Sequence, residues 1–369
     1  MKKFSLILTL ILVLSMLAGC AGTTVVYQTN CTCPVGSHDV TVQETPATEA
    51  PAVEAPAAEG AVKTGLAVIG SIKITDPTGE ADGKASYDVT YAAVNVDDNG
   101  VITACKFDSV GVDVAFDATG AIKTEDGEVL TKHEKGFDYG MVAYGGSTYE
   151  WFEQANSVAA YAVGKTVEEL KAGAIDESGY AVDVDLKTSA SINLFGYVAA
   201  IEKAVANAKH LGAQAGDELK LASINALSAG NLNGDVVAVT MKDGVITSCY
   251  IDSLQAALAV AEDGTVTAGN TLSKNELGYD YGMVAYAGAA FEWFEQAEGF
   301  AAYVTGKTPA DVAGIAVDEG TKPTDADLTA SCTMKVADFL RVVEKAGVTG
   351  GVKTGLSVIT SFSSSKDAS

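Results

Sequence analysis

The stretch "TYEWFEQANSVAAYAVGKT" at residues 148–166 recurs with few changes as "AFEWFEQAEGFAAYVTGKT" at residues 290–308. Trp151 and Trp293, the two tryptophans of the chain, occupy the same place in the two copies and lie 142 residues apart. Self-similarity at a long, fixed spacing is the signature of a duplicated structural unit. The sequence therefore predicts that one fold is built twice.

Matching segments on the N-terminal side extend the repeat. They are "KGFDYGMVAYGG" (135–146) with "LGYDYGMVAYAG" (277–288), and "DNGVITACKFDS" (98–109) with "KDGVITSCYIDS" (242–253). Each copy then holds about 140 residues, an ordinary size for one domain with a single core. We expect a first domain at residues 61–210, called repeat 1, and a second at 211–348, called repeat 2.

Strand signals come first in each copy. Asp97–Gly100 in repeat 1 and Lys242–Gly244 in repeat 2 separate alternating runs, and Asn-Gly or Asp-Gly at such a place favours a β-hairpin. A second, shorter strand pair is expected to turn at 117–120 and at 262–264. The fold class predicted is α+β, in which each copy has a small, mostly antiparallel sheet with helices on it.

Helical patterns follow the strands. One helix is expected from Thr148 to Val163, ending near Gly164, with Gly306 as the counterpart in repeat 2. A last helix is expected to begin at the hydroxyl-rich segment described next, and to end near Gly212 in repeat 1 and at Gly347 in repeat 2. Its apolar face would hold Leu194, Val198, Ile201 and Val205 in repeat 1, and Val336, Phe339, Leu340, Val343 and Ala346 in repeat 2.

The hydroxyl-rich segment reads "DLKTSASI" at 185–192 and "DLTASCTM" at 327–334. In both copies an aspartate is followed, four and six residues later, by a serine and a second hydroxyl residue. Ser and Thr are preferred helix caps, so an ordinary cap is one interpretation. A helix N-terminus with open backbone N–H groups is also an anion site suited to phosphate, and a cap needs only one hydroxyl.

The pattern Asp-x-x-Thr/Ser-Ser/Gly-Ala-Ser/Thr resembles the flavinylation motif of FMN-binding domains. These domains occur in the G subunit of the Rnf complex, in the C subunit of the sodium-pumping NADH:quinone reductase, and in flavinylated extracellular electron-transfer lipoproteins. The resemblance implies that a flavin transferase cleaves FAD and esterifies FMN, through its phosphate, to the last hydroxyl of the motif. The attachment residues implied are Ser191 and Thr333, and the recognition residues are Asp185, Thr188, Ser189, Asp327 and Ser331.

Both copies depart from the motif. Repeat 1 offers Ser191 in place of the commoner threonine. Repeat 2 has Ala330 where Thr or Ser is usual, and Cys332 where Ala is usual. Repeat 1 therefore matches the motif better while repeat 2 has the better acceptor, and the sequence leaves open whether one or both sites are used.

The N-terminal residues predict export and anchoring. Two lysines and an apolar run lead to Leu17-Ala18-Gly19-Cys20, which resembles a bacterial lipobox, although an ordinary secretory signal would look similar. We expect a signal peptide at 1–20, lipidation of Cys20, and a location at the extracytoplasmic face of the cell membrane. Residues 21–60 are rich in Pro, Ala and Glu and are expected to form a tether. Residues 349–369 echo 61–86 and would be a partial third repeat or a closing strand.

Composition and isolated residues exclude several functions. The net charge of −24 argues against a nucleic-acid partner. The cysteines and histidines show no spacing typical of a metal site or of a catalytic triad, so neither metal ligands nor catalytic residues are assigned. Trp151 and Trp293 are expected in the core rather than stacked on a flavin. Cys105, Cys249 and Cys332 are expected to be small buried residues rather than redox thiols.

Three functions remain on the sequence alone. The leading one is an electron carrier, not an enzyme, which receives electrons from a membrane quinol or flavoprotein and relays them outward on covalent FMN. The alternative is a surface lipoprotein, such as an antigen or ligand carrier, that uses the fold without flavin. The third is an enzyme that binds FMN without a covalent bond.

Overall fold

The computed structural model describes residues 60–348. The expected signal peptide with Cys20, the expected tether up to residue 59 and the echo at 349–369 lie outside these residues. Within residues 60–348, no helix has the length and apolar character needed to cross a membrane. The fold is mixed α+β, with small antiparallel sheets and helices, as the sequence predicts.

The first sheet is a three-stranded antiparallel meander. It consists of β1 (Lys63–Thr75), β2 (Gly83–Val96) and β3 (Ile102–Phe116), with β2 in the centre. The predicted turn at Asp97–Gly100 joins β2 to β3, and Gly100 has the positive φ of 80° that such a turn needs. The second predicted strand pair is reduced here to a bridge between Phe116 and Ile122.

The second sheet repeats this meander and adds one edge strand. It consists of β5 (Glu218–Ser228), β6 (Asn231–Lys242) and β7 (Val245–Ala256), preceded at its edge by β4 (Gly127–Glu128). Asp243 and Gly244 both have positive φ, as a two-residue hairpin requires. The strand pair expected around 262–264 is β8 (Leu258–Val260) with β9 (Val266–Ala268).

The helices recur in the same order in both copies. Repeat 1 contains α1 (Lys132–Lys135), the 3-10 helix η1 (Gly136–Tyr139), α2 (Trp151–Ala162), α3 (Val167–Gly173), α4 (Val184–Ser189) and α5 (Phe195–Ala206). Repeat 2 contains α6 (Lys274–Leu277), η2 (Gly278–Tyr281), α7 (Met283–Ala287), α8 (Trp293–Val304), α9 (Pro309–Ala313), α10 (Ala326–Thr329) and α11 (Ala337–Val348). Helices α2 and α8 confirm the prediction from Thr148, although each begins at its tryptophan.

The predicted bounds of the last helix are wrong at both ends. Helix α5 begins at Phe195, after the hydroxyl-rich segment and not within it, because the backbone N–H groups of Ser191 and Ile192 are bonded to a side chain of α2. It ends at Ala206, before Gly212. Helix α11 continues through Gly347, which lies against Pro309 with no space for a Cβ. That glycine permits close packing of α11 and α9 and does not end the helix.

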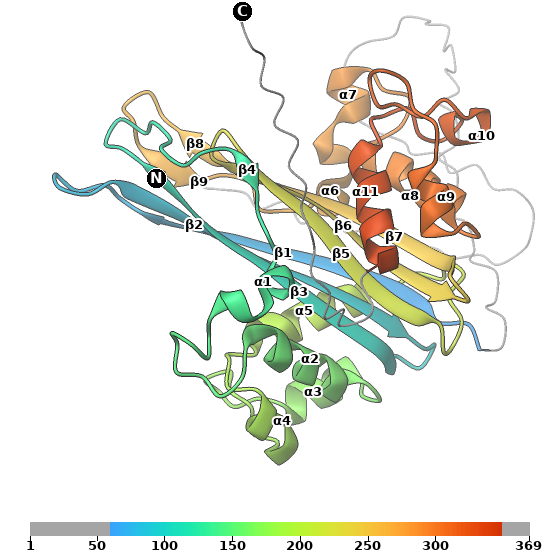
Figure 1. Cartoon of the computed structure of the whole chain (residues 1–369), viewed down its shortest axis with the longest axis horizontal. Coiled ribbons are helices and arrows are strands. Elements are labelled where there is room, and N and C mark those ends of the chain that lie inside the picture. The colour runs from blue at the N-terminus through green and yellow to red at the C-terminus, as the bar shows by residue number, and fades with distance from the viewer. Residues whose placement is uncertain (1–59, 349–369) are drawn as a thin grey trace, which may run out of the picture. The chain divides into compact units, whose positions relative to one another are not determined.

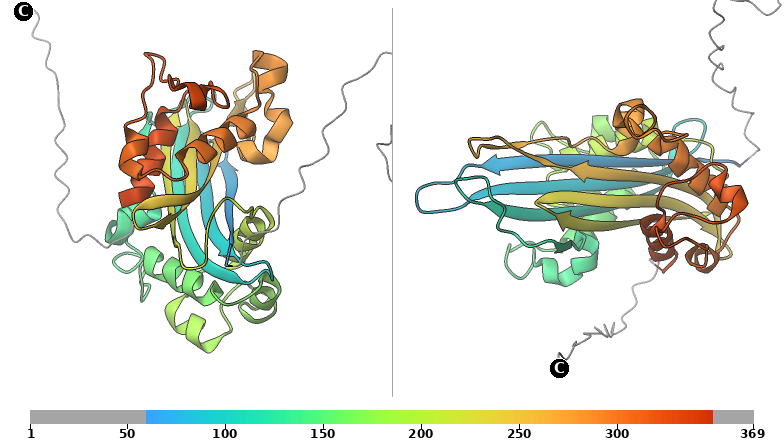
Figure 2. Two further views of the ribbon diagram at one scale, coloured as in Figure 1. Left: turned by 90° about the vertical axis from the view of Figure 1, so that its right-hand side faces the viewer. Right: turned by 90° about the horizontal axis from the view of Figure 1, so that it is seen from above.

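The two sheets pack face to face between two layers of helices (Figures 1 and 2). Alternate strand residues from both sheets form one shared core, which includes Leu66, Val89 and Val110 from the first sheet and Val236 and Leu254 from the second. The opposite face of each sheet carries its own helices and a separate core. The helical layers of repeat 1 and repeat 2 therefore lie on opposite sides of the paired sheets.

Polar contacts across the paired sheets are reciprocal. Lys203 of α5 forms an ion pair with Glu276 of α6 at 2.6 Å, and Lys345 of α11 forms one with Glu134 of α1 at 2.5 Å. Each residue of the second pair lies 142 positions from its equivalent in the first, with the roles of the repeats exchanged. The two copies are thus related by an approximate twofold axis. A buried bond of 2.6 Å from the Tyr91 hydroxyl to Asn225 also joins the sheets, and burial raises the pKa of Tyr91 above its usual range.

Candidate functional site

The hydroxyl-rich segment forms the short helix α4 and the turn after it, not the start of a long helix. Asp183 caps α4 by accepting hydrogen bonds from the backbone N–H groups of Asp185 and Leu186. Thr188 donates to the Asp185 carbonyl at 2.9 Å, and Ser189 donates to the Leu186 carbonyl at 3.3 Å. These hydroxyls therefore bond to carbonyls of α4 itself and none of them caps α5, so the helix-cap interpretation of these residues is wrong.

Repeat 2 is built in the same way around the shorter α10. Asp325 caps the helix, and Ser331 donates to the Leu328 carbonyl at 3.4 Å. Ala330 is exposed and offers no hydroxyl to the last turn, which ends two positions earlier than in repeat 1. Asp185 and Asp327 are both exposed, in the first turns of α4 and α10.

Ser191 is exposed, yet its backbone and hydroxyl are held by one buried side chain. The Gln154 carbonyl oxygen accepts hydrogen bonds from the Ser191 N–H at 2.8 Å, the Ile192 N–H at 3.2 Å and the Ser191 hydroxyl at 3.2 Å. Gln154 lies on α2 and is completely buried. A hydroxyl that donates inward leaves its lone pairs free to face solvent.

Thr333 is held by the same three bonds. The Gln296 carbonyl oxygen accepts from the Thr333 N–H at 2.9 Å, the Met334 N–H at 3.0 Å and the Thr333 hydroxyl at 3.3 Å. Gln296 is also completely buried, on α8. The structure therefore places the two predicted acceptor hydroxyls in equivalent, exposed positions with identical supports.

The amide orientation of each glutamine is determined by its other end. The Gln154 amide nitrogen donates to the Tyr149 carbonyl at 2.8 Å and to Ser147 at 3.1 Å. The Gln296 amide nitrogen donates to the Phe291 carbonyl at 2.9 Å. If either amide were reversed, its NH2 group would face the backbone N–H groups of the motif, and its oxygen would face the carbonyl of Tyr149 or Phe291. The amide carbonyl must therefore face Ser191 or Thr333.

A buried carboxylate shapes the loop that precedes each of these helices. Glu150 accepts from the backbone N–H groups of Met141 at 2.9 Å and Val142 at 3.0 Å, and Glu292 does the same for Met283 and Val284. Both glutamates are about 2% exposed. Their carboxylates also stabilise the positive ends of α2 and α8.

Several other predictions are confirmed. Trp151 and Trp293 are core residues, 3% and 4% exposed, and are not available to stack on a ligand. Cys105, Cys249 and Cys332 are buried and free, and burial raises the pKa of the Cys105 thiol to about 12 and that of Cys332 to about 11. Such thiols remain protonated at neutral pH and make poor nucleophiles.

Sequence reasoning missed Glu150 and Gln154 and their counterparts in repeat 2. The signal was present, because the segment "EWFEQA" with its three polar residues is identical in the two copies. A repeated polar residue on a buried helical face indicates a fixed hydrogen-bonding role. The partner could not be identified, because Gln154 and Ser191 lie 37 positions apart.

Two cavities of about 320 Å³ lie away from the hydroxyl motifs. The first is lined by Lys209, Tyr250, Asp252 and Glu276, among others, where α5 meets repeat 2. Within residues 60–348, no group of His, Cys, Asp and Glu side chains has the arrangement of a metal site. The exposed residues Ser191 and Thr333, unlike these cavities, recur at equivalent positions in the two repeats.

No family model matches the chain, and neither a curated protein nor a solved structure matches it. The functional assignment therefore rests on the residues of the site and on their repetition.

Proposed function

We propose that the chain is a membrane-anchored, extracytoplasmic electron carrier made of two FMN-binding-like domains. FMN is esterified through its phosphate to Ser191, to Thr333, or to both. The observation that carries this proposal is the set of three hydrogen bonds to a buried glutamine, two from each acceptor residue and one from the residue after it, repeated at an offset of 142 residues.

The chemistry of the hydroxyl fits a group-transfer reaction by an external enzyme. A bond forms between Ser191 Oγ and the phosphorus of the FMN half of FAD, the anhydride bond to AMP breaks, and AMP leaves. The hydroxyl proton passes to a base of the transferase or to water, because the Gln154 carbonyl is too weakly basic to hold it. Gln154 contributes orientation, directing the oxygen lone pairs outward toward the incoming phosphorus.

The electrostatics favour a covalent over a non-covalent cofactor. The N–H groups of Ser191 and Ile192 are already bonded to Gln154, so they are not open to a phosphate. The chain carries a net charge of −24, which opposes binding of an anionic ligand by charge alone. An ester retains such a ligand without a basic pocket, and bound FMN would supply reversible electron transfer.

The partners follow from this role. A flavin transferase would modify the protein, and a quinol or a flavoprotein in the membrane would donate electrons. The exposure of both hydroxyls suits the first requirement, because a transferase must reach them on the folded chain.

The test is co-expression of the protein with a flavin transferase, followed by in-gel flavin fluorescence and peptide mass analysis. Peptides that contain Ser191 or Thr333 should gain the mass of one FMN less one water. Ser191→Ala and Thr333→Ala should each abolish the gain at one site only. Ser157→Ala is the matched control, because Ser157 lies outside the motif on α2 and its hydroxyl bonds to its own helix.

Three outcomes would contradict the proposal. Flavin gain that persists in the double variant would place the ester elsewhere. FMN released on denaturation would favour an enzyme with a non-covalent cofactor. Protein that takes up no flavin, while a known substrate of the same transferase does, would favour the surface lipoprotein.

A further inference from the structure

One tyrosine in each repeat is almost fully exposed in the same pose. Tyr144 is 90% exposed and Tyr286 is 88% exposed. Each stands four residues after a glycine with positive φ, Gly140 at 78° and Gly282 at 77°. A Cβ on either glycine would collide with the tyrosine ring. The glycine thus serves two purposes, since it permits the left-handed turn and lets the ring lie directly on the backbone.

The backbone that carries this tyrosine is hydrogen-bonded in both repeats, in a turn for Tyr144 and in α7 for Tyr286. The Tyr144 N–H donates to the Gly140 carbonyl at 2.9 Å, and the Tyr286 N–H donates to the Gly282 carbonyl at the same distance. The buried Glu150 carboxylate fixes Met141 and Val142 beside it. An aromatic ring that is already oriented loses little conformational entropy when it binds a partner.

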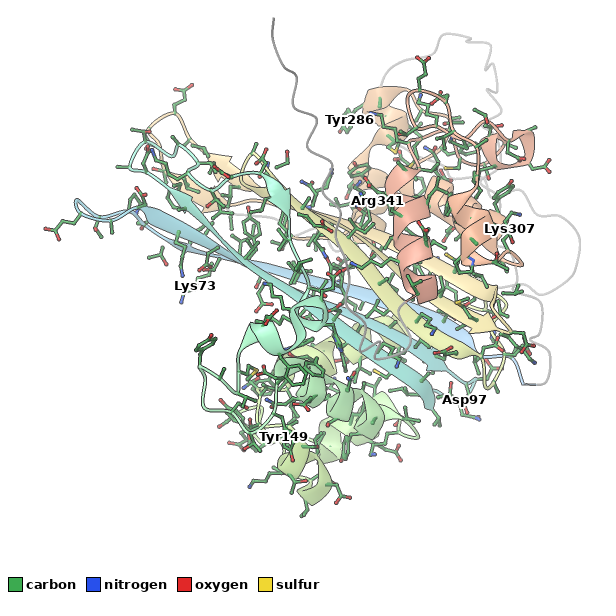
Figure 3. The ribbon with its side chains drawn as sticks, in the orientation of Figure 1. Lys73, Asp97, Tyr149, Tyr286, Lys307 and Arg341 are labelled. Atoms are coloured by element: carbon green, nitrogen blue, oxygen red, sulfur yellow. The ribbon has the colours of Figure 1, made fainter. Side chains whose placement is uncertain are left out.

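Further exposed apolar residues lie near Tyr144 and Tyr286 in the sequence, at equivalent positions of the two repeats. Val142 is 45% exposed and Tyr149 is 40% exposed, and their counterparts Val284 and Phe291 are 44% and 37% exposed. Figure 3 shows Tyr149 and Tyr286 on the helical sides of repeat 1 and repeat 2, away from the paired sheets. Single exposed apolar residues are common, but a matched set in two repeats indicates a binding surface.

This loop is joined to the acceptor residue through one side chain. Gln154 donates to the Tyr149 carbonyl and lies 4.0 Å from the Met141 sulfur, while its carbonyl holds Ser191. Gln296 connects Phe291 and Met283 to Thr333 in the same way. A ligand attached to Ser191 or Thr333 would therefore begin at a residue whose glutamine partner also contacts the segment that carries Tyr144 or Tyr286.

We propose that Tyr144 and Tyr286 are the positioning residues for the isoalloxazine rings of the two attached flavins. The inference rests on the proposed function. A planar, electron-poor ring system stacks favourably on an electron-rich phenol face, with the apolar neighbours covering its dimethylbenzene edge. The buried Trp151 and Trp293 cannot take this role. A stacked tyrosine also quenches flavin fluorescence by donating an electron to the excited ring, which gives a direct readout.

The experiment uses the full chain with one flavin at a time. In the Thr333→Ala background, only Ser191 carries FMN, and Tyr144→Leu removes the aromatic face. Because a stacked aromatic pair is worth a factor of about two to ten in the docked-to-free ratio, we expect the undocked, fluorescent fraction per bound flavin to rise about two- to tenfold. Fluorescence anisotropy should fall at the same time, and Tyr144→Phe should preserve the anisotropy.

The other repeat supplies the matched control. In the Ser191→Ala background, only Thr333 carries FMN, so Tyr144→Leu should change nothing there while Tyr286→Leu should raise the fluorescence. Peptide mass gives the flavin content of each variant. If FMN is attached but Tyr144→Leu leaves lifetime and anisotropy unchanged, this inference is overturned and the proposed function stands. If FMN is attached at neither hydroxyl, the proposed function itself fails.

Discussion

The two hydroxyl sites differ in what leads up to them and agree in what holds them. In repeat 1 the helix α4 runs to Ser189, and Thr188 in its last turn donates to the Asp185 carbonyl. In repeat 2 the helix α10 ends at Thr329, and Ala330 has no hydroxyl to offer. Yet Gln154 and Gln296 make the same three bonds to Ser191 and Thr333. The comparison indicates that the orientation of the Ser191 and Thr333 hydroxyls depends on the glutamine rather than on the preceding hydroxyl residues.

The largest effect should come from removing the glutamine. Gln154→Leu leaves the part-buried N–H groups of Ser191 and Ile192 without an acceptor, and because solvent can partly replace it we expect a loss of about 1 to 3 kcal/mol in total. We expect flavin attachment at Ser191 to fall while attachment at Thr333 is unaffected, with Gln296→Leu giving the converse. Urea unfolding and peptide mass measure the two effects. Asn156→Ala, an exposed change on the same helix, is the control.

Equal flavin attachment at Ser191 in the wild type and in Gln154→Leu would contradict the prediction that the glutamine controls the site. It would show that the transferase orients the hydroxyl by itself. The bonds from Gln154 would then serve the fold alone.

A buried carboxyl group of repeat 2 gives a prediction about the pH dependence of stability. Asp252 is 4% exposed, and burial raises its pKa from 3.8 to about 6. Between these values the folded state binds the proton more tightly than the unfolded state, so the free energy of unfolding falls as the pH rises from about 4 to 6, by roughly 3 kcal/mol. Asp252→Asn should remove this decline, which urea unfolding at pH 4 to 7 would reveal.

Asp108→Asn, the matched change in repeat 1, controls for loss of the equivalent carboxylate hydrogen bonds. Other carboxyl groups titrate in the same range, so the quantity to compare is the difference between variant and wild type at each pH. A difference that does not change between pH 4 and pH 6 would contradict the prediction for Asp252.

The reciprocal ion pairs test how closely the two copies are equivalent. Lys203 also donates to the Val68 carbonyl, and Lys345 to the Ser223 carbonyl. Both ammonium groups are about one quarter exposed. Lys203→Met and Lys345→Met should each lower the free energy of unfolding by about 1 kcal/mol, because partly exposed pairs are screened by solvent. Thermal unfolding should give equal losses, and a large inequality would show that one repeat contributes more to the contact.

The smallest effect is expected from restoring the missing hydroxyl. Ala330→Thr would add a second hydroxyl to the last turn of α10, beside that of Thr329, which already donates to the Ala326 carbonyl at 3.1 Å. We expect a change of only a few tenths of a kcal/mol in stability, since surface substitutions rarely exceed about 0.5 kcal/mol. Attachment at Thr333 should rise modestly, as measured by peptide mass. A rise larger than the loss caused by Gln296→Leu would show that the hydroxyl, not the glutamine, controls the site.

Local signals predicted much of the fold. Asp243-Gly244 requires positive φ at both residues, and such a requirement can be read from two letters. The helix at Trp151 was predictable from its spacing and its following glycine. The strand sequence also carried an unused signal, since β2 is apolar on both faces between Tyr91 and Val96. Strands buried on both faces need a second layer, and here that layer is the other sheet.

The site was predictable only in part. The hydroxyl positions followed from the repeated pattern, but the start of α5 was misplaced, because hydroxyls that suit a helix N-terminus can equally bond the carbonyls at a helix C-terminus. The supports from Gln154 and Glu150 depend on contacts between distant positions, which spacing alone does not encode. The exposure of Tyr144 depends on the glycine beneath its ring, and this relation appears only in three dimensions.

The face-to-face sheets make the described chain equivalent to a homodimer whose subunits are covalently joined. An ordinary dimer dissociates on dilution, so its stability varies with protein concentration. Here the connection between α5 and β5 holds the second apolar face close to the first at a high effective concentration. The pairing of the two repeats should therefore be independent of how many copies of the protein a cell makes.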